Sequence, residues 1–206
     1  MANTRHRESR TLLRLLLQDP KIAPHLAALR AYHPDTARHS IRVASLALDL
    51  GIENRLSTEE LVWQGTGALL HDRGKTQTPI GILTKPSPLD AYEFEIMDDH
   101  PRQGYILLAD FPAPVRAIVV GHHEHQADPY PRSGINRRKR PSSDRRTYLE
   151  NIRELTQMVA AADMFDALTS ARGYKPALPI SRVAELMEQE YRGDPIFRRQ
   201  MLERAA

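Results

Sequence analysis

The sequence contains no cysteine among its 206 residues. Disulfides are therefore excluded, and any metal must be held by nitrogen and oxygen ligands. The chain also lacks an apolar run long enough to span a bilayer. Its first ten residues are polar and lack the apolar segment of a signal peptide. These absences favour a cytoplasmic protein that does not insert into a membrane.

The chain as a whole has no large excess of one charge, since its formal net charge is +3. With 41% hydrophobic residues and a mean hydropathy of −0.51, it has the composition of an ordinary globular protein with one ample core. Its basic residues are unevenly distributed along the chain, however. Residues 137–140 read Arg-Arg-Lys-Arg, and Arg145-Arg146 follow shortly after. Such a cluster marks either an anionic partner or a solvated loop.

No stretch shows the alternation that is typical of a strand, and apolar residues recur at helical spacing instead. The pattern predicts an all-α fold, with a short N-terminal helical extension over residues 1–34 and a compact helical bundle over residues 35–206. Residues 76–88 are expected to form a loop, and residues 126–147 break the helical pattern. Helices are expected at about 8–18, 22–32, 35–51, 57–72, 89–99, 100 onward, 114–123, 148–168, 181–191 and 194 onward.

Several helix ends carry local signals. Ser57 and Glu60 are spaced as a capping box at the start of a helix. Gly51 is expected as the residue just beyond the end of the preceding helix. Ser181 and Asp194 are each expected to cap a later helix, and Gly74 is expected to allow a sharp exit after the helix before it.

Histidine and aspartate recur at the ends of these apolar helices. A buried imidazole or carboxylate needs a partner that satisfies it, and a metal ion is one such partner. A single histidine of this kind is more often a hydrogen-bonded core residue, and a lone His-Asp pair is more often a solvated helix end. Eight such groups in one small bundle are hard to satisfy by pairwise hydrogen bonds. They are Asp35, His39, His71, Asp72, His100, His122, His123 and Asp163.

This set of side chains predicts a metal centre. Imidazole and carboxylate ligands without thiolate suit Fe or Mn, and also Zn or Ni. More ligands than one ion can use indicate two or three divalent metals that share a carboxylate. Adjacent metals of that kind generate a bridging hydroxide and hold a phosphoryl group in line. Lys75, shortly after the His71-Asp72 pair, is placed to meet a phosphate, although alone it would more simply be a surface lysine.

Taken in order, these residues resemble the HD-GYP subgroup of the HD phosphohydrolase superfamily. The resemblance covers about residues 35–190, and the ordered set of motifs is highly specific. The subgroup has a compact helical fold, and its members hydrolyse cyclic di-GMP, a bacterial second messenger, to pGpG and in some cases onward to GMP. The matching segments are RHSIRV at 38–43, HDRGK at 71–75, LTKP at 83–86, His100-Pro101 with Gly104, HHE at 122–124, and ADMFDALTSARGYK at 162–175.

The resemblance implies roles for individual residues. Asp72 would bridge two metals, and Lys75 would contact the scissile phosphate, so these two form the catalytic pair. Asp35 stands where members with three metals have a Glu, which makes it a shorter candidate ligand for a third metal. Arg172 and Lys175 match basic residues that hold the phosphates and guanine of the substrate. The other implied metal ligands are His39, His71, His100, His122, His123 and Asp163.

The sequence departs from the subgroup at the motif that names it. The Gly-Tyr-Pro expected after His-His-Glu is here Pro129-Tyr130-Pro131, one residue nearer to the histidine pair. Its usual Asp-Gly-x-Gly lead-in is reduced to Ala127-Asp128. Tyr130 is kept as a candidate substrate-binding residue, but the two flexible glycines are lost. This altered loop bears on substrate preference, and the segment 126–146 is a candidate surface for a protein partner.

We therefore expect a metal-dependent phosphodiesterase that hydrolyses cyclic di-GMP through a hydroxide bridging two metals. One alternative is the same site acting on another phosphorylated nucleotide, and a second is a module that binds cyclic di-GMP or a partner protein without turnover. A third, an RNA or DNA binder working through residues 137–146, ranks lowest because no aromatic platform lies beside the charges. Residues 1–34 are too short for the receiver or sensor domain that many members carry, so we expect control through expression, these helices or a partner.

Overall fold

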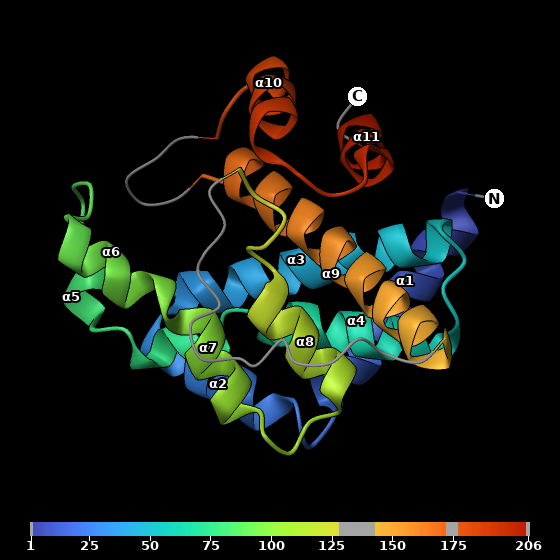
Figure 1. Ribbon diagram of the computed structural model, residues 1–206, viewed down its shortest axis with the longest axis horizontal. Helices are drawn as coiled ribbons and strands as arrows, with labels where there is room; N and C mark the ends of the chain where they lie inside the picture. Colours follow the sequence, from blue (N-terminus) through green and yellow to red (C-terminus); the bar gives the residue numbers. More distant parts are fainter. Residues whose placement is uncertain (1, 128–142, 172–176, 205–206) are drawn as a thin grey trace.

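The computed structural model describes residues 2–127, 143–171 and 177–204, and within these all regular structure is helical (Figure 1). The one pairing of extended backbone there is an isolated bridge between Gln126 and Tyr191. No helix in these ranges is long and apolar enough to cross a membrane. The helices are α1 (Ala2–Gln18), α2 (Ala23–Tyr32), α3 (Pro34–Glu53), α4 (Thr58–Leu70), the 3-10 helix η1 (Arg73–Gln77), α5 (Ile80–Leu83), α6 (Ala91–Asp98), α7 (His100–Leu107), α8 (Ala113–Gly121), α9 (Ser143–Thr169), α10 (Ile180–Glu190) and α11 (Pro195–Glu203).

Helix α3 is the centre of the bundle. It packs against α4, α9, α1 and α2, and α9 crosses it in Figure 1. Its residues Val43, Ala47 and Leu50 recur at helical spacing and are fully buried, because that face of the helix meets other helices on its whole length. α8 packs on α4 and α9, and α7 packs on α8 and η1. The helix ends that carry histidine and aspartate are thereby drawn to one place.

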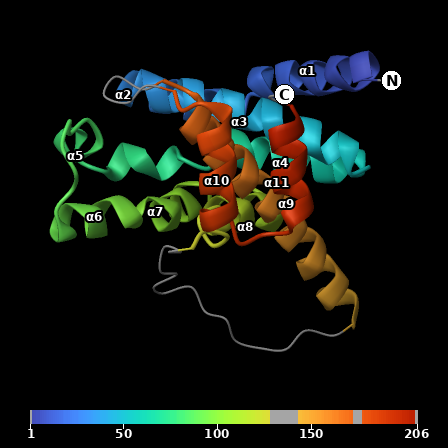
Figure 2. The same ribbon diagram turned by 90° about the horizontal axis from the view of Figure 1, so that it is seen from above.

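The two N-terminal helices share this core. α1 packs on α3 and α4, and Figure 2 shows it along one edge of the molecule. Leu16, Ile22 and Leu26 belong to the same apolar cluster as the buried residues of α3 and α4. The division of the chain at residue 34 stays a prediction, and packing joins the two segments in one core.

Local signals were correct at two helix starts and wrong at three other positions. The capping box of α4 is confirmed, because the Ser57 side chain accepts from the Glu60 N–H and the Glu60 carboxylate accepts from the Ser57 N–H. The predicted Asp194 cap is also confirmed, since its side chain accepts from the Ile196 N–H at 2.9 Å. Ser181 is not a cap, because Pro179 already holds the extended conformation before α10. The expected loop over 76–88 contains the short helix α5.

The prediction that α3 ends at Gly51 is wrong, because the helix continues to Glu53. A Cβ on Gly51 would lie 2.3 Å from Oε1 of Gln64, so glycine at this position allows α4 to approach α3 closely. The chain reverses through a Schellman motif instead, in which the Leu56 N–H donates to the Gly51 carbonyl at 3.0 Å. Arg55 takes the left-handed conformation that this motif needs, with φ of 60°.

Candidate metal centre

The predicted ligands are brought together by the ends of α4, α7 and α8 and by the facing sides of α3 and α9. His71 and His122 are the C-caps of α4 and α8, and His100 is the first residue of α7. His71 and His122 are fully buried, and Asp72 and His100 are each only 1% exposed. Solvent therefore contributes almost nothing to satisfying these polar side chains.

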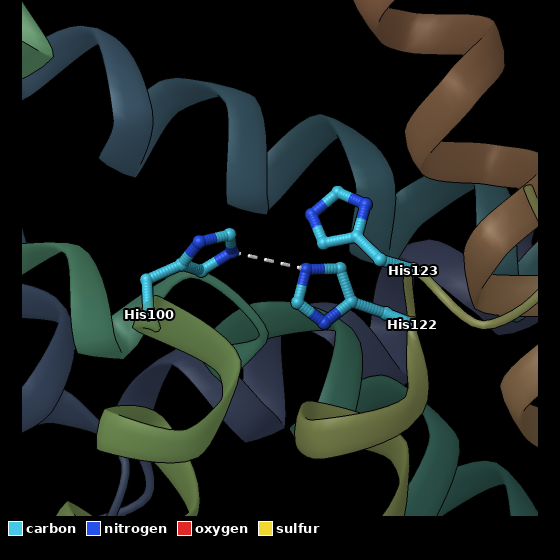
Figure 3. A group of neighbouring side chains, drawn as sticks. All are labelled: His100, His122 and His123. Atoms are coloured by element: carbon cyan, nitrogen blue, oxygen red, sulfur yellow. Dashed lines mark hydrogen bonds between the residues drawn. The ribbon is translucent and has the colours of Figure 1, made fainter. Parts of the chain in front are cut away.

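Seven of the eight predicted ligands form three overlapping groups, in each of which the ligand atoms lie within 4.8 Å of one another. The groups share His71 and His122, so they make one continuous cluster. Figure 3 shows the imidazoles of His100, His122 and His123 converging. A cluster of this extent can hold more than one divalent metal ion. The groups are His39, His71 and Asp163; His71, Asp72 and His122; and His100, His122 and His123.

Backbone carbonyls set the orientation of three of these imidazoles. Nδ1 of His71, His100 and His122 lies 2.8, 2.8 and 2.7 Å from the carbonyl oxygen three residues earlier. A carbonyl can only accept, so Nδ1 carries the proton in each ring and Nε2 has the lone pair. The three histidines thus present the nitrogen form that ligates metals.

Two buried atoms in this cluster lack a hydrogen-bond partner among the described residues: Nε2 of His71 and Oδ1 of Asp72. Each carries a lone pair. Leaving such atoms unsatisfied is costly. A metal cation would satisfy both at once, so the donor set fits divalent metals bound through nitrogen and oxygen.

Burial and neighbouring charges set the protonation of the cluster. Burial lowers the pKa of His122 well below its usual value, and the nearby His123 lowers it further. Burial also lowers the pKa of His123, to about 3. Burial would raise the pKa of Asp72, but Lys75 and His71 outweigh it and hold that pKa well below its usual value. Neutral imidazoles and a charged carboxylate are the states that bind divalent metals.

The cluster opens into a cavity of about 1220 Å³, whose lining includes Asp72, Lys75, His123 and Asp163. Nζ of Lys75 lies 2.7 Å from Oδ2 of Asp72, and the Lys75 side chain is 17% exposed. The cavity therefore has a cation and potential metal ligands on the same wall. Other parts of its lining are apolar: Leu83, Phe94 and Met97 come from α5 and α6, and Met164, Leu168 and Leu186 come from α9 and α10.

Of the remaining predicted site residues, the described part of the chain contains Asp35, which belongs to none of the ligand groups. Asp35 lines the same cavity, but its side chain is exposed and pairs with Arg38 on the next turn of α3. Tyr130, Arg172 and Lys175 lie outside the described residues, as do residues 137–140 of the basic segment. Their predicted roles in substrate and partner binding stay predictions.

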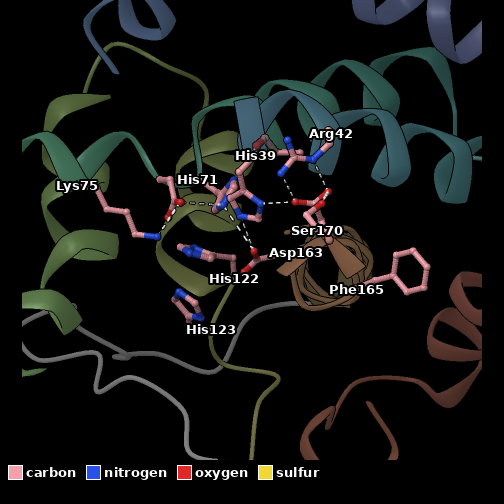
Figure 4. Close-up of polar contacts among 12 residues, drawn as sticks. His39, Arg42, His71, Lys75, His122, His123, Asp163, Phe165 and Ser170 are labelled. Carbon is pink, nitrogen blue, oxygen red and sulfur yellow. Dashed lines mark hydrogen bonds and ion pairs between the residues drawn. The ribbon is translucent and has the colours of Figure 1, made fainter. Parts of the chain in front are cut away.

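Two residues at the site were not assigned a role from the sequence. The Asp166 carboxylate lies 2.6 Å from Nδ1 of His39, and Arg42 donates to both of its oxygens at 2.7 and 2.9 Å (Figure 4). Burial would lower the pKa of His39, but its hydrogen bonds to Asp163 and Asp166 raise it to about 9. A spacing signal was present, because Arg42 follows His39 by three residues and Asp166 follows Asp163 by three, which places each on the face of a predicted ligand.

Comparisons with known proteins gave a family match and several relatives. The HD domain family model matches residues 36–168. The 3′3′-cGAMP-specific phosphodiesterase 3 of Vibrio cholerae is 33% identical over 162 residues, which cover 77% of this chain and 32% of that protein. A cyclic di-GMP phosphodiesterase of Pseudomonas aeruginosa is 33% identical over 179 residues, 82% of this chain and 40% of that protein. The response regulator RpfG of Xanthomonas campestris, also named a cyclic di-GMP phosphodiesterase, is 38% identical over 129 residues, 59% of this chain and 30% of that protein. The chain thus spans well under half the length of these relatives.

Proposed function

Because this chain belongs to the HD domain family, we propose that it is a metal-dependent phosphodiesterase that hydrolyses cyclic di-GMP to pGpG or GMP. The family and the all-α fold predicted from the sequence are confirmed. The observation that carries the proposal is the cluster of seven potential nitrogen and oxygen ligands, six of them buried, in the wall of a large cavity with Lys75 beside it. Relatives named for cyclic di-GMP hydrolysis support this choice of substrate.

We propose that the seven clustered residues hold two divalent metals, Fe or Mn in preference to Zn or Ni, with Asp72 between them. Oδ2 of Asp72 lies 3.5 Å from Nε2 of His71, whereas its Oδ1 lies 3.3 Å from Nε2 of His100. His71 and His100 belong to different ligand groups, so the two oxygens of one carboxylate face both parts of the cluster. When bound, such metals supply Lewis-acid chemistry that activates water and offsets the charge of a phosphoryl group.

The residues of the chain itself bind and orient the substrate in this proposal. Lys75 provides a positive charge for a phosphate oxygen at the cavity wall, and Asp72 holds its ammonium group next to the metal ligands. The apolar walls at Phe94 and at Leu168 exclude water and accept the flat faces of the bases. A cavity of about 1220 Å³ has room for a dinucleotide.

A second candidate substrate is 3′3′-cGAMP. It is favoured by the relatives from Vibrio cholerae that are named as 3′3′-cGAMP-specific phosphodiesterases and match this chain at 30% to 33% identity. The cavity lining offers the same wall residues to either cyclic dinucleotide. The choice between the two therefore depends on the base contacts, which substrate competition measures.

The test is hydrolysis by the purified chain after anaerobic loading with Fe(II) or Mn(II). Cyclic di-GMP and 3′3′-cGAMP are supplied separately and then together, and the products are resolved by chromatography. We expect pGpG or GMP to form from cyclic di-GMP at the higher kcat/KM. A protein that contains stoichiometric metal and converts neither substrate would contradict the proposed activity and favour a binding module.

Substitution of Lys75 tests its proposed contact with the phosphate. We expect Lys75→Ala to lower kcat/KM about 100- to 1000-fold, because one charged contact to the transition state is lost, while the metal content stays the same. Lys85→Ala is the matched control, since Lys85 pairs with Glu93 of α6 and is not among the residues that line the cavity. Loss of metal from Lys75→Ala would show instead that Lys75 acts by holding the Asp72 carboxylate.

The metal count tests the proposed role of Asp35. To ligate a third metal, its carboxylate would have to leave Arg38, and it belongs to none of the three ligand groups. We expect the wild type and Asp35→Asn to bind two metals per chain, as measured by elemental analysis after gel filtration. Three metals in the wild type and two in Asp35→Asn would establish Asp35 as the third-metal ligand.

A further inference from the structure

We infer that Asp166 and Arg42 form a positioning pair that fixes the imidazole of His39 for metal binding. This inference rests on the proposed metal-dependent function and adds two residues to it. Neither residue belongs to the three groups of potential metal ligands. Both act through His39, whose Nε2 lies 2.9 Å from Oδ1 of Asp163 on the cluster side of the ring.

His39 differs from the other clustered histidines in where it lies on its helix. His71, His100 and His122 lie at helix ends, and each donates from Nδ1 to the carbonyl three residues earlier. Carbonyls near a helix end have no partner within the helix and are free to accept such a bond. His39 lies within α3, five residues after its first residue Pro34 and well before its last, Glu53. The carbonyls of the turn before it are used by the helix itself, so its Nδ1 needs an acceptor from another helix.

Asp166 of α9 is that acceptor. Its Oδ2 lies 2.6 Å from Nδ1 of His39, on the side of the ring away from the cluster. A hydrogen bond at this position leaves Nε2 as the atom that can face a metal, and it stops the ring from turning about its own axis. Asp166 thus does for His39, from a different helix, what a carbonyl of the local chain does for the other three histidines.

Arg42 holds the Asp166 carboxylate in place. Asp166 is only 3% exposed, so its charge must be compensated by hydrogen bonds and an opposite charge. The Arg42 guanidinium contacts both carboxylate oxygens, at 2.7 and 2.9 Å, and the Ser170 hydroxyl donates to Oδ1 at 3.0 Å. A planar guanidinium that meets a carboxylate through two bonds fixes its rotation as well as its position. With every donor in place, Oδ2 remains directed at Nδ1 of His39.

The simpler interpretation is that Arg42 and Asp166 only tie α3 to α9. Such a role would change the stability of the metal-free protein and leave its metal affinity unchanged. A positioning role predicts that metal affinity falls, because the lost hydrogen bond is to the metal ligand His39. Metal affinity, measured beside metal-free stability, therefore separates the two.

The experiment measures Mn(II) and Zn(II) binding by competition with a chelator of known affinity, in the full chain stripped of metal. We expect Asp166→Asn to weaken metal binding about 10- to 100-fold, the usual cost of disturbing the partner of a metal-ligating histidine, because an amide has one acceptor oxygen and cannot accept from both His39 and Arg42 as the carboxylate does. Glu53→Gln is the matched control. It removes a carboxylate of α3 that, like Asp166, pairs with an arginine, in this case Arg204 of the C-terminal segment, away from the cluster. We expect its metal affinity to equal that of the wild type.

A second pair of variants serves if Asp166→Asn does not fold. Arg42 is half-exposed, so Arg42→Gln leaves no large cavity, and we expect a smaller loss of metal affinity that Arg42→Lys partly restores. Wild-type affinity in Asp166→Asn, or in both Arg42 variants, would overturn the inference and leave the proposed function intact. A wild type that binds no metal would overturn both.

Discussion

Asp72→Ala is expected to lose its bound metal and at least about 1000-fold of its turnover, while the helical bundle stays folded. The two oxygens of Asp72 face His71 and His100, so the substitution removes the carboxylate that joins both parts of the ligand cluster. Losing even one electrostatic contact to a transition state costs about 100- to 1000-fold, and here metal binding is lost as well. The fold is retained because the surrounding apolar core, including Leu69, Leu70 and Val119, is unchanged.

Metal content, turnover of cyclic di-GMP and thermal unfolding measure these three expectations separately. Glu53→Ala is a suitable control, because it removes a carboxylate that pairs with Arg204 and belongs neither to the cavity lining nor to the ligand groups. Unchanged turnover in Asp72→Ala would refute the site as assigned. An unfolded Asp72→Ala protein would be uninformative about catalysis, and Asp72→Asn, which keeps the side-chain shape, then provides the comparison.

Gly74→Ala is expected to have the largest effect of any single methyl group added at the site. A Cβ on Gly74 would lie 1.9 Å from the carbonyl oxygen of His100 and 2.5 Å from the backbone nitrogen of Gly104. Both neighbours are backbone atoms, so they cannot turn aside as a flexible side chain could. Helix α7 must therefore move away from η1, and His100 moves with it, away from Asp72.

We expect Gly74→Ala to lower the free energy of unfolding by about 1–3 kcal/mol or more, as for other overpacked sites, and to weaken metal binding. Gly81→Ala in α5 is the control, because a Cβ there meets nothing within 4 Å. Alanine in a helix is favoured over glycine by about 0.5–1 kcal/mol, so the control should be neutral or slightly stabilising. A Gly74→Ala protein with wild-type stability and metal content would show that η1 and α7 do not need their close approach.

Local features of this protein could be predicted because they depend on residues within one helical turn. The capping box of Ser57 and Glu60 joins groups three residues apart, and their order in the sequence is enough to identify it. The same holds for the apolar faces of α3 and α9, whose periodicity predicted the all-α fold. It also holds for the placement of histidine and aspartate at the ends of buried helices, which predicted a metal centre.

The sequence by itself therefore determined most of the helices, the candidate ligands and the family, whereas the tertiary structure decided how those ligands are grouped. His39 meets Asp166 across 127 positions of the chain, and helical spacing says only which residues share a face. Gly51 and Gly74 are needed for the close approach of helices, which no local turn signal reveals. Asp35 shares a face with His39 and yet pairs with Arg38 outside the cluster. Each of these outcomes depends on distances between helices, and those distances are set by how the side chains of the whole core pack together.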